Sequence, residues 1–210
     1  MNEKKTLRAT KKQVLHISTL SLGINILYSI ANFALGVWSK SYWFLTMGAY
    51  NLILVIMRAS VITFARQSKN PNSARFIQAF IGVMLVLLSF VLGSSVYLSV
   101  KHDVAQSFHE IIMITIATYT FTKITLAIVN YIKKNRYNSN IISTLRGITL
   151  CDATASVYST QKSMLVSFQG MTASDIRLMN ILTGTGVFII VCLLGVMMII
   201  KSKKEIIKNG

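Results

Sequence analysis

The sequence predicts an all-α, polytopic membrane protein with six transmembrane helices, and three observations predict this fold class. Hydrophobic residues make up 53% of the chain and charged residues only 13%, whereas soluble domains are about a quarter charged. Basic residues cluster in short tracts between long apolar segments. Each apolar segment reaches the length of about 20 residues that a membrane-spanning helix needs. The six predicted spans are 14–38, 42–65, 76–100, 109–132, 141–168 and 179–200.

These segments are predicted to be helices because backbone groups in hydrocarbon must satisfy their own hydrogen bonds. Alternating runs of about ten residues, typical of a β-barrel, are absent from the sequence. The first span follows a basic start that resembles a signal peptide, but its apolar run is too long and lacks a small-residue cleavage site. The predicted domains are therefore a basic tail (1–13), a six-helix transmembrane domain (14–200) and a second basic tail (201–210).

The distribution of Lys and Arg predicts the orientation. Fifteen of these residues lie in the two tails and in the second and fourth connections, and three lie in the opposite connections (Lys40, Lys101 and Arg177). Basic residues favour the cytoplasmic side, so both termini are predicted to be cytoplasmic in a multi-pass protein of the cell membrane. Trp38, Tyr42 and Trp43 flank the first outer connection, as interfacial aromatic residues do.

Composition and motifs exclude several function classes. The net charge of +16 follows the membrane topology and does not form the basic face of a soluble nucleic-acid-binding module. No phosphate loop, HExxH or serine elbow is present, so no enzyme activity is predicted. Cys151 and Cys192 have no paired spacing for a disulfide or a zinc site and are interpreted as small buried side chains. No cofactor and no bound metal are predicted.

The predicted spans differ in polarity. The third and sixth are almost uniformly apolar and carry glycines, so they are expected to face lipid at the periphery. The fourth carries Lys123 and several threonines, among them Thr115, Thr118, Thr122 and Thr125. The fifth is the least apolar, with Asp152, Lys162 and many hydroxyl groups. Because such a helix is costly in lipid, the fifth is expected to face protein or water.

A weak internal repeat suggests a 3+3 arrangement. An offset of 98 residues aligns the first two helices with the fourth and fifth, and it superposes Asn32 on Asn130 and Ser41 on Ser139. Repeat-built membrane folds place their sites near the midplane, between the halves.

Asp152 is the clearest candidate for a functional residue, because it is the only acid well inside a span and intramembrane carboxylates mark functional sites. The alternative is a structural ion pair with Lys123 or Arg146. Lys123 is expected to meet Asp152, whereas Arg58 is expected to extend to the cytoplasmic headgroups. Both interpretations of Asp152 remain open at this point.

Two further groups are weaker candidates. Asn25 and Asn32 lie two turns apart on one helix face, where they either bind a ligand or bond between helices. Four residues near the third connection could collect a divalent cation, although a solvated loop is the simpler interpretation. These four are His102, Asp103, His109 and Glu110.

Two segments resemble the cation diffusion facilitators, which are divalent-metal/proton antiporters. The stretch SLGINILYSIANFALGVWSKSYWFLTMGAY resembles their first two helices through Asn25, Gly36 and Ser41, and NSNIISTLRGITLCDATAS resembles their fifth. The resemblance implies an inner bundle of the first, second, fourth and fifth helices, and a homodimer. The family's cytoplasmic carboxy-terminal domain is expected to be absent, because the chain ends soon after Lys208.

The positions that the resemblance aligns with metal ligands differ in this chain. The second-helix positions are Tyr50 and Leu54, with Met47 in place of a preceding acid, and the fifth-helix positions are Ile148 and Asp152. A shift by one turn gives Cys151 and Ala155 instead. Zinc needs about four N, S or O ligands, so Asp152 with Cys151, Tyr50 or Asn25 forms an incomplete metal site.

Two function hypotheses follow. In the first, the protein is transporter-like on a cation-efflux scaffold, its substrate unknown, with an ion pathway through Asp152, Lys123, Asn25, Tyr50 and Cys151. In the second, it is a non-transporting membrane scaffold or an accessory subunit that binds a partner protein. The expected partners are the lipid bilayer and either a second copy or a membrane subunit.

Overall fold

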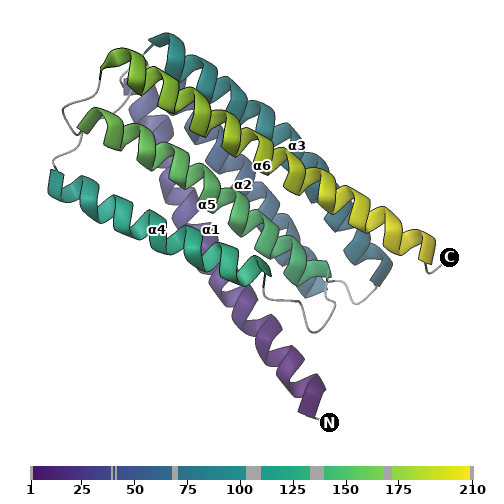
Figure 1. Ribbon diagram of the computed structural model, residues 1–210. Helices are drawn as coiled ribbons and strands as arrows, with labels where there is room; N and C mark the ends of the chain where they lie inside the picture. Colours follow the sequence, from purple (N-terminus) through teal and green to yellow (C-terminus); the bar gives the residue numbers. More distant parts are fainter. Residues whose placement is uncertain are drawn as a thin grey trace.

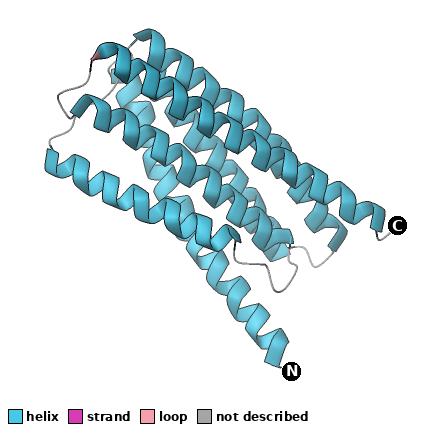
Figure 2. Cartoon of the chain, viewed as in Figure 1, coloured by secondary structure: helices cyan, strands magenta, loops and turns pink. Residues whose placement is uncertain are grey.

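The computed structural model describes the backbone of residues 2–38, 40, 42–67, 71–102, 110–132, 140–167 and 172–208. Side chains are described within 18–38, 40, 42, 44–65, 74–98, 110–132, 141–167 and 172–204. These parts form an all-helical bundle whose helices run alternately up and down, so that both termini lie at the same end (Figures 1 and 2). The helices are α1 (Asn2–Trp38), α2 (Tyr42–Gln67), α3 (Pro71–His102), α4 (Glu110–Ile132), α5 (Asn140–Ser167) and α6 (Ala173–Lys208).

Five of the described helices are long and apolar enough to cross a membrane: α1, α2, α3, α4 and α6. The protein is therefore a membrane protein by the character of its helices. The helix α5 is not among these five, because its polar residues lower its hydropathy. The basic segments predicted as tails continue the helices, since α1 begins at Asn2 and α6 ends at Lys208.

Helix ends follow local sequence rules. Helix α3 begins with Pro71, whose fixed φ and missing N–H suit the first helical position. Thr172 caps α6: its hydroxyl accepts a bond from the backbone N–H of Asp175 (3.3 Å) and donates to the Asp175 carboxylate (2.6 Å). This reciprocal arrangement resembles a capping box and fixes where α6 starts.

Helix α5 occupies the centre of the bundle. It contacts each of the other five described helices, and Val166 is the only exposed residue among the described side chains of 141–167. The prediction that this polar helix faces protein or water is therefore confirmed, since the surrounding helices shield its hydroxyl and charged groups.

The main core lies between α2, α3, α5 and α6. It includes Leu54, Leu88, Ile148 and Val191, one from each of these helices. The second and fifth helices belong to the inner bundle as expected, but the expected inner position of the first and fourth is wrong, as is the peripheral position of the third and sixth.

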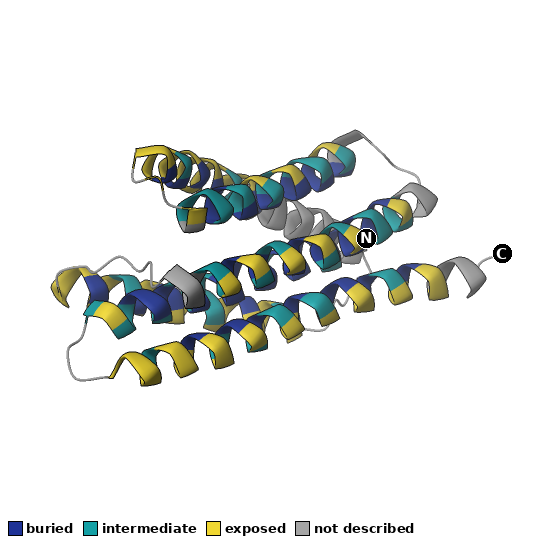
Figure 3. Ribbon diagram, turned by 90° about the horizontal axis from the view of Figure 1, so that it is seen from above, coloured by how far each residue is buried: buried dark blue, intermediate teal, exposed yellow. Residues whose placement is uncertain are grey.

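The physical reason for this difference is the close approach of α3 and α6. A Cβ on Gly82 would lie 2.9 Å from the carbonyl oxygen of Gly195, so the two backbones touch at these glycines. Small residues allow such contact between membrane helices. The apolar side chains of α3 and α6 then reach the core, and exposed residues follow their outer sides (Figure 3).

Helices α1 and α4 are the least buried of the apolar spans. In each of them 22% of the most apolar stretch is buried inside the protein. In the described ranges the backbone of α4 approaches that of α5 alone, and the backbone of α1 approaches those of α2 and α5. The exposed hydroxyls of Thr115, Thr118, Thr122 and Thr125 donate to the carbonyl four residues earlier. This outer face of α4 can therefore meet lipid without unsatisfied donors.

Candidate functional site

Asp152 lies near the middle of α5, and two cations from two other helices bind its carboxylate. Arg58 of α2 donates from Nη2 to Oδ2 at 2.8 Å. Lys123 of α4 donates from Nζ to Oδ1 at 2.9 Å. We call these three side chains the ion triad. It links α2 and α4 to the central helix.

Burial differs among the members of the ion triad. The exposed fraction of the side chain is 1% for Arg58 and 5% for Asp152, but 21% for Lys123. The Lys123 ammonium also donates to Ser156 Oγ at 2.7 Å, and Ser156 donates to the Asp152 backbone carbonyl at 2.8 Å. Lys123 is thus held by two acceptors one turn apart on α5 and keeps one accessible side.

The expectation that Arg58 extends to the cytoplasmic headgroups is wrong. Its guanidinium points into the bundle because the charge of Asp152 is within its reach, and leaving a buried carboxylate with fewer partners is costly. The spacing of residues along α2 indicates this inward direction, although the bounds of the predicted spans do not. Arg58 shares a helical stripe with the buried Tyr50, Leu54 and Val61.

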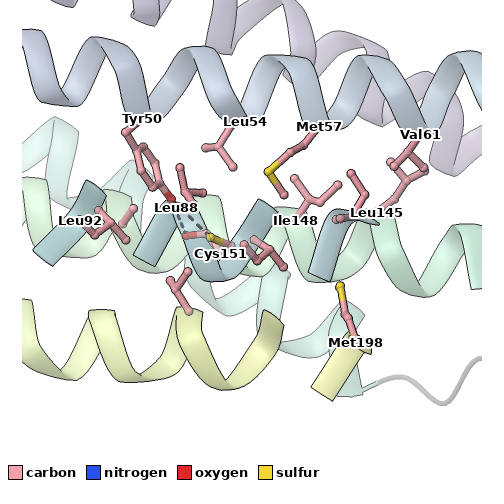
Figure 4. Close-up of a cluster of buried hydrophobic side chains, with 14 of the residues drawn as sticks. Tyr50, Leu54, Met57, Val61, Leu88, Leu92, Leu145, Ile148, Cys151 and Met198 are labelled. Carbon is pink, nitrogen blue, oxygen red and sulfur yellow. Dashed lines mark hydrogen bonds between the residues drawn. The ribbon is translucent and has the colours of Figure 1, made fainter. Parts of the chain in front are cut away.

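Tyr50 and Cys151 meet beside the ion triad. The Tyr50 hydroxyl donates to the Cys151 carbonyl oxygen at 3.3 Å and lies 3.5 Å from Cys151 Sγ. Figure 4 shows this contact together with Leu54 and Ile148, all within the core between α2 and α5. The positions aligned with metal ligands are therefore filled mainly by apolar packing, and Asp152 is the one that carries charge.

Asn25 lies on α1 and is 4% exposed. Its side-chain Nδ2 is buried without a hydrogen-bond partner, and no described contact joins it to the ion triad. The structure thus brings together four of the five predicted pathway residues, Asp152, Lys123, Tyr50 and Cys151, and leaves Asn25 on a separate helix. Asn32, on the same face, donates to the Tyr28 carbonyl within α1.

A hydroxyl pair extends the polar contact between α4 and α5. Thr120 and Thr160 have their Oγ1 atoms 2.8 Å apart, and both residues are buried. The sequence indicates polar residues on both helices but does not predict this pairing. The pairing depends on the register between α4 and α5, which local sequence does not determine.

A cation site at Asp152 is disfavoured by its partners, since both carboxylate oxygens already accept bonds from protein cations. In the described ranges no three His, Cys, Asp or Glu side chains gather as a metal site would require. His102, Asp103 and His109 lie outside the described side chains, and Glu110 starts α4.

Replacing Tyr50 with Phe tests the contact beside the ion triad. We expect the free energy of unfolding to fall by about 0.5–1.5 kcal/mol, because one buried hydrogen bond is lost while the ring still fills the core. Thermal unfolding of the purified protein in detergent measures this change. Tyr97→Phe, at a residue 64% exposed, is the matched control and should leave the unfolding temperature unchanged.

Comparison with protein-family models, with curated proteins and with solved structures finds no match to this chain. The architecture and the ion triad therefore define it as an all-helical membrane protein with a buried interhelical salt bridge. The resemblance to cation diffusion facilitators stays a prediction from the sequence.

Proposed function

We propose that this chain is a six-span membrane module that acts as a scaffold or an accessory subunit for a membrane partner, without exchanging cations at Asp152. One observation carries this proposal: Arg58 and Lys123 occupy both oxygens of the only carboxylate inside the described bundle. A cation carrier needs a carboxylate that can release its partner and bind the substrate. In this protein the side chains of Arg58 and Lys123 would compete with a substrate cation for Asp152, and both belong to the same bundle.

The sixth span in this proposal is α5. Its 28 residues are long enough to cross the hydrocarbon, and its burial among the other helices removes the cost of its polar groups. The shared end of the two termini (Figure 1) supports an even number of spans. The excess of Lys and Arg in the tails supports a cytoplasmic position for that end.

A transporter-like protein is the second candidate, and the exposure of Lys123 favours it. The 21% exposed fraction of this side chain leaves the carboxylate–ammonium pair accessible on one side. In a transport cycle Lys123 would leave Asp152, and a proton or cation would take its place. Arg58 would remain bound to the other oxygen.

Flux through reconstituted protein separates the two candidates. Proteoliposomes with the wild-type chain are loaded with a zinc-sensitive or a pH-sensitive dye and given a zinc or proton gradient. The proposal expects the same flux as in empty liposomes, and the same result for Asp152→Asn. Zinc or proton flux above that background, lost in Asp152→Asn, would contradict the module and establish the transporter.

A further inference from the structure

The charges of the ion triad do not balance. Arg58 and Lys123 are two cations, and Asp152 is the single acid with which either forms an ion pair among the described residues. One positive charge therefore remains at a depth where an uncompensated charge is expensive. We infer that the ion triad is a binding site for one monovalent anionic group.

Two buried donors, one in the ion triad and one on α1, support this inference. Arg58 Nε and Asn25 Nδ2 are both buried and have no hydrogen-bond partner. The Nε–H of arginine can only donate, and so can an amide NH₂ group. Each unsatisfied buried donor is costly, and an anion bound here would accept hydrogen bonds from such donors and balance the excess charge.

The helix register places Asn25 at the depth of the ion triad. Ser29 of α1 donates to the Gly48 carbonyl of α2 at 3.0 Å, and Asn25 lies one turn, about 6 Å, further from the outer connection. Along the bundle axis, Asp152 lies between Tyr50 and Arg58 of α2. Tyr50 bonds to Cys151, which is adjacent to Asp152 in the chain, and Arg58 bonds to Asp152 itself. Asn25 therefore lies within about one turn of the depth of Asp152.

Access is from the side of Lys123. This residue belongs to α4, whose backbone approaches no described helix except α5, and its side chain is the most exposed of the ion triad. A small anion such as formate or chloride fits this chemistry when the site is reached through water. A carboxylate on an apolar partner helix fits it when the site is reached through lipid.

The inference rests on the membrane-embedded bundle proposed above, but it holds for a module and for a transporter alike. A negative result in the flux measurement therefore leaves it intact. Its own rival is a bundle that tolerates the excess charge without any ligand.

Thermal unfolding of the full chain in a neutral detergent tests the site. Sodium formate or chloride replaces sodium gluconate at constant ionic strength. The expected result is a saturable rise of the unfolding temperature, roughly 5–10 °C at a hundredfold excess over the dissociation constant. Lys123→Met should lose the rise. Lys201→Met, at an exposed lysine bonded to Ser143, is the matched control and should keep it.

Asn25→Leu provides a second variant that keeps the ion triad, in case Lys123→Met does not fold. It should weaken the apparent affinity for formate by about tenfold, because one charge-assisted hydrogen bond is lost. A rise of equal size and affinity in Asn25→Leu and in the wild type would contradict the role of Asn25 and the inferred site.

A leucine-rich transmembrane peptide with one central Glu distinguishes the source of the anion. If it raises the unfolding temperature, while its Gln variant and formate do not, the anion belongs to a partner helix. If neither the dissolved anions nor the peptide stabilises the wild-type protein, the bundle tolerates the charge without a ligand, and the inference is overturned.

Discussion

Replacing Asp152 with Asn is expected to lower the free energy of unfolding by about 3–5 kcal/mol, the cost of breaking a buried ion pair by removing one partner. The amide has the same shape but no charge, so Arg58 stays buried at 1% exposure without a counter-charge. Thermal unfolding in detergent, followed by circular dichroism, should show a decrease of roughly 10 °C.

The control for this variant is Glu110→Gln, the same chemical change at an exposed acid in the first turn of α4. It should cost no more than about 1 kcal/mol, since no described side chain pairs with this carboxylate and the helix dipole stabilises it weakly. Equal unfolding temperatures for Asp152→Asn and the wild type would show that the ion triad does not stabilise the bundle.

A triple variant separates the charge from the packing. Arg58→Met, Asp152→Leu and Lys123→Met together remove both cations and the acid, so no charge is left unpaired in the bundle. Apolar replacement of a buried ion pair is often neutral or stabilising. The triple variant should therefore unfold at a higher temperature than Asp152→Asn alone.

The helical spans were the most predictable feature of this chain, because hydrocarbon thickness and backbone desolvation act on composition directly. The position of α5 was predictable for the same reason, since its polar groups require neighbours that are not lipid. Which helices surround α5 was not predictable from the sequence. It depends on how closely pairs of helices approach, and a few glycines in α3 and α6 decide that.

The candidate site shows the same limit. Asp152 and Lys123 were predicted as partners because each is a lone charge in a polar span. For Arg58 the sequence predicts contact with the headgroups, because a long side chain near a helix end can reach water. Its pairing depends on which face of α2 is turned toward α5. The buried residues Leu54 and Val61 lie on the same face as Arg58 and show that this face points into the bundle.

Packing at the crossing of α3 and α6 should be as sensitive as the ion triad. A Cβ on Gly195 would lie 2.8 Å from the Gly82 carbonyl oxygen and 3.0 Å from the backbone nitrogen of Val86. These are backbone atoms, so they move only if the helices separate. We expect Gly195→Ala to cost about 1–3 kcal/mol through overpacking, and Gly195→Leu to cost more, in thermal unfolding of the purified protein.

Gly186→Ala is the matched control because it lies in the same helix, and a Cβ there meets no atom within 4 Å. Alanine is a better helix former than glycine by about 1 kcal/mol, so this variant should be as stable as the wild type or more stable. The opposite signs at Gly195 and Gly186 separate interhelical contact from helix propensity. If Gly195→Ala also raises the unfolding temperature, α3 and α6 do not meet at their glycines, and the core between α2, α3, α5 and α6 must be arranged differently.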